Sequence, residues 1–335
     1  MNLKEISIID IEDIKIGSAE DRENATGCTV ILCEKGAPAG IDVRGGGPAS
    51  RESELLNPVA AADKIHAILL SGGSAFGLDA AGGVMEYLEQ KNVGVDTGVA
   101  KVPLVCCSCL FDLQLVSKRV RPDKAMAYRA CSGSYQDGNY GAGTGATVGK
   151  YKGTEFMMKS GIGSYAVQLG ELKIGAIVAV NALGDIFDYR TGQQIAGLLN
   201  QEKDGYLSTE EEMYKQCGQV KDLFTGNTTI GAVITNARFN KGQMNKIAAM
   251  AQNGYARAIR PVHTEADGDT IYALSTGDVT ADINGVGTLA AQVTAEAIKR
   301  AVFAADPAYG LPAAKDLLKE RDANRVNNLR KCLFL

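Results

Sequence analysis

The residues best suited to chemistry stand in two short segments, Asn227-Thr228 and Asp267-Gly268-Asp269. Thr228 begins an apolar β run directly after a long polar stretch, so its hydroxyl would lie at the end of a buried strand. A threonine there is also typical of β-propensity alone, and Asp-Gly-Asp is typical of an ordinary turn. If the two segments meet, they supply a nucleophilic hydroxyl and two carboxylates to orient it. Gly268 would permit the backbone bend that turns both carboxylates the same way.

A hydroxyl nucleophile needs a base, and the chain offers few. It contains 2 His in 335 residues, which excludes a His-rich metal site, and His66 lies in an apolar strand-like run where packing is more typical than catalysis. A free α-amino group, with a pKa near ~8, can instead accept the hydroxyl proton. Thr228 carries such an amine only if the preceding bond is broken, and Asn before Thr is a self-cleavage junction of N-terminal-nucleophile hydrolases. The sequence therefore predicts cleavage at Asn227–Thr228, into residues 1–227 and 228–335.

A glycine-rich segment, residues 138–150, allows three interpretations. A phosphate-binding P-loop is excluded because Thr144 stands at the first glycine position and Tyr151 follows Lys150. A dinucleotide fingerprint is disfavoured because a loop, not a strand, precedes Gly141. The third interpretation is a tight turn that presents Lys150 and main-chain amides to a site. A turn that serves only close packing remains an equal alternative.

Ser74 is the other hydroxyl that resembles a nucleophile, because it follows an apolar strand-like run and precedes a helical one. The pattern Gly-x-Ser-x-Gly is missed at its last position, where Phe76 stands. We therefore interpret Ser74 as a helix cap.

Composition narrows the function further. The 35 Lys and Arg against 39 Asp and Glu give a net charge of −4, which argues against a general nucleic-acid binder. No apolar run approaches ~20 residues, so no membrane span is expected. The 8 Cys have no metal-site spacing and are interpreted as thiols of a reducing compartment, which predicts a cytoplasmic protein without metal or other cofactor.

The hydrophobic pattern predicts strands that alternate with long helices, and hence an α/β fold. Between the core elements, residues 191–226 are expected to form a solvent-facing excursion with a short acidic helix that begins at Ser208. The strands are expected at 7–16, 28–33, 65–70, 173–180, 228–235 and 270–275, and the main helices at 79–90, 241–252 and 286–304.

Several segments together resemble the L-aminopeptidase/D-esterase family, which also holds β-peptidyl aminopeptidases and 6-aminohexanoate-oligomer (nylon oligomer) hydrolases. The resemblance extends from the N-terminal strands to about Gly277, and the Asn-Thr junction is most similar to the nylon-oligomer branch. The segments are Ser71–Gly77, Asp96–Pro103, Gly141–Lys150, Ser160–Ser164 and Asn227–Asn236.

The resemblance implies a four-layer αββα sandwich, a single domain of residues 1–335 assembled from both fragments, and a homo-oligomer such as a tetramer. It implies that Thr228 is the nucleophile and that Lys150 and Asn181 serve the site, Asn181 by binding the oxyanion. Asp267 and Asp269 would match the paired residues that orient the nucleophile. Some aminopeptidases of the family use a Tyr near the segment aligned with residues 109–112, and this chain has none there.

The function expected from these observations is hydrolysis of a linear amide, such as a 6-aminohexanoate oligomer, by an N-terminal threonine. The alternatives are an aminopeptidase or D-amino-acid esterase-amidase, and a β-peptidyl aminopeptidase. Acyl transfer of the ornithine acetyltransferase type and a non-catalytic binding protein of the same fold are further alternatives.

Overall fold

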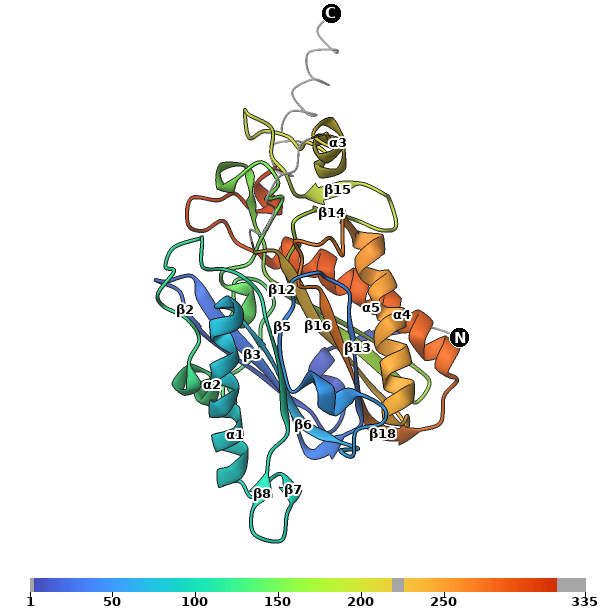
Figure 1. Cartoon of the computed structure of the whole chain (residues 1–335). Helices are drawn as coiled ribbons and strands as arrows, with labels where there is room; N and C mark the ends of the chain where they lie inside the picture. Colours follow the sequence, from blue (N-terminus) through green and yellow to red (C-terminus); the bar gives the residue numbers. More distant parts are fainter. Residues whose placement is uncertain (1–2, 219–225, 318–335) are drawn as a thin grey trace, which may run out of the picture.

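A computed structural model describes residues 3–218 and 226–317 of the chain. Of the domain expected over residues 1–335, the segments 1–2, 219–225 and 318–335 lie outside the described residues. Two mixed β-sheets and their covering helices form the body of the protein, so the expected α/β class is confirmed (Figure 1).

The first sheet has six strands in the order β1-β12-β13-β16-β18-β4. Only β16 and β18 run parallel among its neighbouring pairs; the other pairs are antiparallel. Two long helices, α4 and α5, cover its outer face. The bounds are β1 Lys4–Ile6, β4 Ala39–Val43, β12 Ile162–Leu169, β13 Leu172–Asn181, β16 Thr228–Ala237, β18 Thr270–Val279, α4 Lys241–Ala258 and α5 Ile283–Ala304.

The second sheet has five strands in the order β2-β3-β6-β9-β5, with α1 and α2 on its outer face. The apolar inner faces of the two sheets pack on each other through side chains such as Ile31 and Ile68 of one and Ile177 and Ile230 of the other. The layers therefore run helices, sheet, sheet, helices (Figure 1). The bounds are β2 Lys15–Asp21, β3 Thr26–Ala37, β5 Ala49–Arg51, β6 Ile65–Ser71, β9 Val105–Cys109, α1 Ala81–Gln90 and α2 Lys124–Ala130.

Smaller elements complete the chain. Among the described residues, three small sheets lie outside the two main ones, and the short helix α3 lies near β14 and β15 at one end of the molecule (Figure 1). Their bounds are β7 Val95–Asp96 with β8 Lys101–Val102, β10 Thr147–Val148 with β11 Met158–Lys159, β14 Asp185–Phe187 with β15 Gln194–Ala196 and β17 Ile259–Arg260, and α3 Thr209–Lys215.

The apolar runs at 28–33, 65–70, 173–180, 228–235 and 270–275 all form strands, as expected, but two other element predictions are wrong. The run 7–16 is not a strand: it holds a 3₁₀ turn, Ile8–Asp10, and only the start of β2. The helix expected to end at Gln252 continues to Ala258, because Gly254 lies within it. A Cβ on Gly254 would come within 2.5 Å of the Ala291 carbonyl oxygen, so this glycine permits close packing of α4 on α5 rather than ending the helix.

Two loop predictions also need correction. Ser74 does not cap a helix: it has a φ of 54° and follows Gly73, and no side-chain cap bond forms there. The excursion 191–226 is only partly solvent-facing, since residues 195–199 contribute buried apolar side chains to the core. The acidic helix α3 does begin after Ser208, whose hydroxyl accepts the Glu211 amide.

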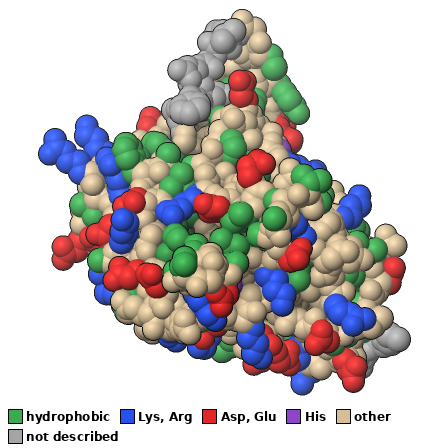
Figure 2. All heavy atoms as spheres, turned by 60° about the horizontal axis from the view of Figure 1, so that its bottom comes forward, with side chains coloured by type: hydrophobic (Ala, Val, Ile, Leu, Met, Phe, Trp, Pro, Cys, Tyr) green, Lys and Arg blue, Asp and Glu red, His purple; other side chains and the backbone are tan. Residues whose placement is uncertain are grey.

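The surface carries charges of both signs. On the face shown in Figure 2, Lys and Arg side chains alternate with Asp and Glu, and no continuous basic patch forms. The seven cysteines among the described residues are all free thiols. None of the described helices combines the length and hydropathy that a membrane crossing requires.

Candidate active site

The first sheet brings the expected site residues together at the ends of its inner strands. Asn181 ends β13 and Thr228 begins the antiparallel β16, so the two residues are paired directly in the ladder. The strand β18 runs parallel to β16, with Ile230 beside Thr270, which places the segment before Thr270 next to Thr228. Residues far apart in the sequence therefore meet at the start of β16.

The peptide bond between Asn227 and Thr228 has an unusual environment. The Asn227 carbonyl oxygen accepts a hydrogen bond of 2.9 Å from the Gly268 amide and a short one from the Thr228 hydroxyl. Thr228 is 5% exposed, and Asn227 forms a parallel bridge with Asp267. The hydroxyl thus lies against the carbonyl of the bond expected to break, and a main-chain donor lies on the carbonyl oxygen.

The side chain of Asn181 is held in one orientation. Its Oδ1 accepts from Lys150 Nζ at 2.7 Å and from the Thr147 amide at 3.1 Å, so its Nδ2 is the group that faces away from these donors. Nδ2 donates to the Phe111 carbonyl at 3.0 Å and reaches the Gly226 carbonyl at 3.5 Å. The amide donor therefore points at the segment just before the junction.

Lys150 is buried beside the same segment. Its Nζ donates to the Asn181 carbonyl at 3.1 Å and to the Gly226 carbonyl at 3.3 Å, besides Asn181 Oδ1. Burial lowers the pKa of Lys150 to about 7, although the charges of Asp267 and Asp112 oppose the shift. The ammonium and the neutral amine are thus both accessible near neutral pH.

The glycine-rich segment presents Lys150 and the main-chain amide of Thr147 to Asn181, but not the amides at its end. The amides of Gly149 and Lys150 donate to the carbonyls of Gly184 and Leu183, so they hold the segment on the end of β13. Gly149 has a φ of 72°, and a Cβ there would lie 2.1 Å from the Gly197 carbonyl carbon. Both expected roles, presentation of the lysine and close packing, apply.

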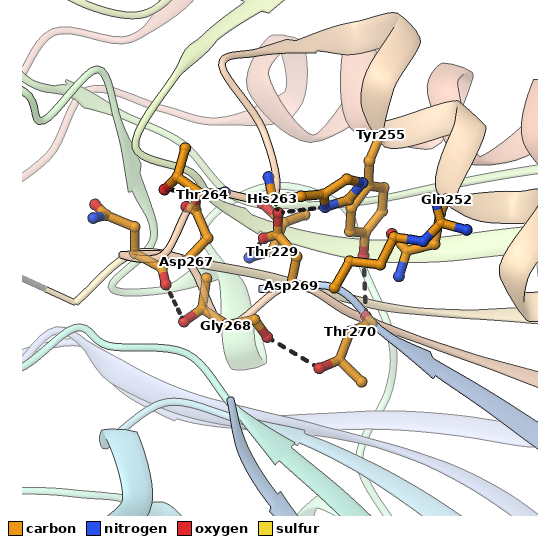
Figure 3. Close-up of polar contacts among 12 residues, drawn as sticks. Thr229, Gln252, Tyr255, His263, Thr264, Asp267, Gly268, Asp269 and Thr270 are labelled. Atoms are coloured by element: carbon orange, nitrogen blue, oxygen red, sulfur yellow. Dashed lines mark hydrogen bonds and ion pairs between the residues drawn. The ribbon is translucent and has the colours of Figure 1, made fainter. Parts of the chain in front are cut away.

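Asp267 and Asp269 flank Gly268 as expected, yet neither forms a hydrogen bond with the Thr228 hydroxyl. Asp267 Oδ2 accepts from the Thr264 amide and hydroxyl, and its Oδ1 is 3.5 Å from the Leu183 amide. Burial, and then the charge of Asp269, raise the pKa of Asp267 to about 6. Asp269 Oδ1 accepts the Thr229 amide at 2.8 Å, so this carboxylate holds the strand immediately after Thr228 (Figure 3).

The role expected of Gly268 is also different in the structure. Its φ is not in the positive region, so it does not supply a special bend. A Cβ at Gly268 would instead lie 2.8 Å from Thr228 Oγ1 and 2.9 Å from the Gly47 carbonyl oxygen. The glycine is needed because the strand that carries Thr228 approaches it closely.

Sequence reasoning missed three parts of the site. Residues 45–47, three consecutive glycines, pack on Asp267-Gly268-Asp269, and the Gly47 amide donates to the Asp267 carbonyl at 2.8 Å. Phe111 contacts Gly226 with its ring and Asn181 with its carbonyl. His263 contacts Asp269. In the sequence, the run of three glycines could have pointed to residues 45–47, and the scarcity of histidine could have drawn attention to His263.

Two cavities lie away from the expected site residues. A cavity of about 630 Å³ beside β1 and one of about 320 Å³ near the end of β18 are not lined by any of the expected site residues. Within residues 3–218 and 226–317, no three His, Cys, Asp or Glu side chains are grouped as a metal ion would require.

Comparison with known proteins identifies the family. The model of peptidase family S58 matches residues 7–315. The chain belongs to peptidase family S58. It is 36% identical over 337 residues to an uncharacterized aminopeptidase of Mycobacterium leprae, covering 91% of this chain and 92% of the relative. It is 32% identical to a 6-aminohexanoate-oligomer endohydrolase of Paenarthrobacter ureafaciens, covering 82% and 76%.

This S58 peptidase also shares its fold with solved structures. The L-aminopeptidase D-Ala-esterase/amidase of Ochrobactrum anthropi, described as a variant of the Ntn hydrolase fold, superposes with a TM-score of 0.65 at 18% identity, covering 89% of this chain and 86% of that one. The resemblance inferred from the sequence is therefore confirmed. The protein is a hydrolase that acts on amide bonds.

Proposed function

We propose that this S58 peptidase is an N-terminal-threonine amidase that first cleaves its own chain at Asn227–Thr228. The observation that carries the proposal is the pair of contacts on the Asn227 carbonyl oxygen, from the Thr228 hydroxyl and the Gly268 amide. A hydroxyl beside the carbonyl and a donor on its oxygen are the two parts that an acyl shift requires.

In the self-cleavage step, Thr228 Oγ1 attacks the Asn227 carbonyl carbon, and the negative charge develops on the oxygen that the Gly268 amide contacts. The carbon–nitrogen bond then breaks, the Thr228 nitrogen takes a proton, and an ester joins Asn227 to the hydroxyl oxygen. Water hydrolyses the ester and leaves a free carboxyl on Asn227 and a free amine on Thr228. Before that amine exists, the neutral amine of Lys150 is the candidate proton acceptor, because its pKa is about 7.

In turnover, the new α-amine of Thr228 accepts the hydroxyl proton and the oxygen attacks a substrate carbonyl. Lys150 Nζ and Asn181 Nδ2 now contact the Gly226 carbonyl, and departure of this segment would free both donors for the substrate oxygen. Removal of one such donor typically lowers kcat by about 10²–10³-fold. The carbon–nitrogen bond of the substrate then breaks, the departing amine takes the proton held by the α-amine, and water releases the acyl group from Thr228 as a carboxylic acid.

The substrate class proposed is a linear amide, with 6-aminohexanoate oligomers first. The relative of Paenarthrobacter ureafaciens named for that activity supports it. The relative of Mycobacterium leprae named as an aminopeptidase supports the alternative, release of an N-terminal amino acid from a peptide or amide. We further propose a single catalytic domain, a homo-oligomer and a cytoplasmic location, the last because the described cysteines are free thiols.

The proposal is tested on the purified protein by intact mass and N-terminal sequencing. We expect two chains, residues 1–227 and 228–335, the second with Thr228 at its N-terminus. The same sample is assayed against a 6-aminohexanoate oligomer, an amino-acid anilide and a β-peptide, and its oligomeric state is measured by light scattering. Full turnover by a sample whose only N-terminus is Met1 would overturn the mechanism.

A further inference from the structure

His263 lies at the site without any role in the chemistry described so far. It stands in the loop between β17 and β18, and its ring stacks on Tyr255 of α4 with centroids 6.0 Å apart and an interplanar angle of 28°. Its backbone has a φ of 59°, a region that side-chain-bearing residues rarely occupy. Figure 3 shows the ring turned toward Asp269.

Two bonds join His263 to one oxygen of Asp269. The backbone amide donates to Asp269 Oδ2 at 3.0 Å, and ring Nδ1 lies 3.0 Å from the same oxygen. The other oxygen, Oδ1, accepts the amide of Thr229 at 2.8 Å. A continuous set of bonds therefore connects the imidazole to the residue that follows the nucleophile.

We propose that His263 is a positioning residue: its Nδ1–H fixes the Asp269 carboxylate, and the carboxylate fixes the start of β16. The catalytic consequence rests on the proposed role of Thr228, whereas the contact itself does not. A carboxylate oxygen only accepts, so Nδ1 of His263 carries the proton. Nε2 is buried and has no hydrogen-bond partner among the described residues, which fits a nitrogen that carries no proton.

The other histidine is a built-in control. Nδ1 of His66 accepts the Leu104 amide at 3.1 Å, so the proton of the neutral His66 ring belongs on Nε2. The chain contains these 2 His alone, and the two are expected to show opposite tautomers. Long-range ¹H–¹⁵N spectra of protein labelled in histidine distinguish them, and the spectrum of a His263 variant assigns the signals.

Two amide variants separate positioning from mere filling of space. In His263→Asn the side-chain N–H replaces Nδ1–H, whereas in His263→Gln the amide reaches the position of Nε2 instead. We expect the Gln variant to lose about 10²-fold in kcat with little change in KM, as a misplaced reacting group does. The Asn variant should retain most of the parental kcat. The thermal unfolding midpoint of each variant reports any loss of stability separately.

The amide of Thr229 gives a readout that needs no activity. Its hydrogen exchange should accelerate in the Gln variant and remain slow in the Asn variant, because Asp269 holds this N–H. An Nε2–H tautomer at His263, or equal exchange and equal kcat in the two variants, would overturn the inference. A parental chain that never exposes Thr228 would instead overturn the proposed function, while the tautomer and the Thr229 exchange still decide the role of His263.

Discussion

Lys150 ends the glycine-rich segment 138–150, and Lys159 follows it nine residues later. Both lysines are buried, but they differ in what they contact. In both, burial lowers the pKa to about 7. Lys150 Nζ contacts the Asn181 side chain and the Gly226 carbonyl. Among the described residues, Lys159 Nζ contacts only main-chain carbonyls, at 3.0 Å from those of Gly143 and Ala146 and closer to that of Ser160.

The difference shows that a perturbed pKa does not by itself identify a catalytic group. Lys159 satisfies the carbonyls of a tight turn, a structural task. Lys150 reaches Gly226, the residue before the junction, and lies in the field of Asp267, a charge that does not act on Lys159. The contacts, rather than the burial, are what support the proposed role of Lys150.

The largest expected effect tests whether the junction beside Lys150 is the reacting group at all. Thr228→Ala should abolish both self-cleavage and turnover, because the same hydroxyl serves both, and Thr228→Ser should retain part of each. The matched control is Thr229→Val, which removes a buried hydroxyl without a partner among the described residues. Intact mass and kcat are measured. Normal turnover by Thr228→Ala would exclude Thr228 as the nucleophile, and the reason for giving Lys150 a role in the reaction would be lost with it.

The next effect separates the two lysines directly. Lys150→Met should lower kcat by about 10²–10⁴-fold, the range of a lost proton-transfer group, and should slow self-cleavage. Lys159→Met should leave the kcat of the folded protein close to parental. The comparison fails if both variants lose kcat alike in folded samples.

Asp267 distinguishes the two lysines further, because its charge acts on Lys150 and not on Lys159. We expect Asp267→Asn and Asp269→Asn each to lower kcat by about 10²-fold, since both hold main-chain groups at the site. Asp96→Asn in the exposed β7–β8 turn is the control and should change stability by less than about 0.5 kcal/mol. Parental kcat in both site variants would mean that Asp267-Gly268-Asp269 is only a turn.

The smallest effect concerns stability. Lys159→Met removes the side-chain donor shared by the carbonyls of Gly143, Ala146 and Ser160. The first two keep main-chain donors, the amides of Ala146 and Ser160, so the unsatisfied Ser160 carbonyl should account for most of a loss of about 1–3 kcal/mol in the free energy of unfolding. Urea titration measures the loss, and Thr228→Ala provides an unprocessed background for it. Unchanged stability would mean that Lys159 contributes nothing to the turn.

The same variant should also change the pH dependence. Between about pH 7 and 10.5 the unfolded chain protonates Lys159 and the folded chain does not, so the free energy of unfolding rises with pH. Above pH 9 the buried thiols oppose this rise, because burial raises the pKa of groups such as Cys33 from 9.0. From pH 7 to 9, the rise should therefore be shallower in Lys159→Met than in the parent, as urea titrations at both pH values would show.

Most of the elements could be predicted from the sequence, because a buried strand is recognisable from its own residues as a short apolar run. The runs at 28–33, 65–70 and 228–235 became β3, β6 and β16. It failed at 7–16, where scattered isoleucines imitate alternation, and at Gly254, where the reason for the glycine lies on another helix. A local pattern cannot show which distant backbone approaches a glycine.

By itself, the sequence also determined the chemistry that was available: a Thr after Asn, two carboxylates, and almost no histidine. Only the tertiary structure decided which groups meet. The pairing of Asn181 with Thr228 follows from the register of β13 on β16, and the place of Asp269 follows from the parallel pairing of β16 with β18. These contacts join residues tens of positions apart, and they depend on how strands pair, which no single segment encodes. For the same reason the histidine that holds Asp269 was visible only in the folded chain.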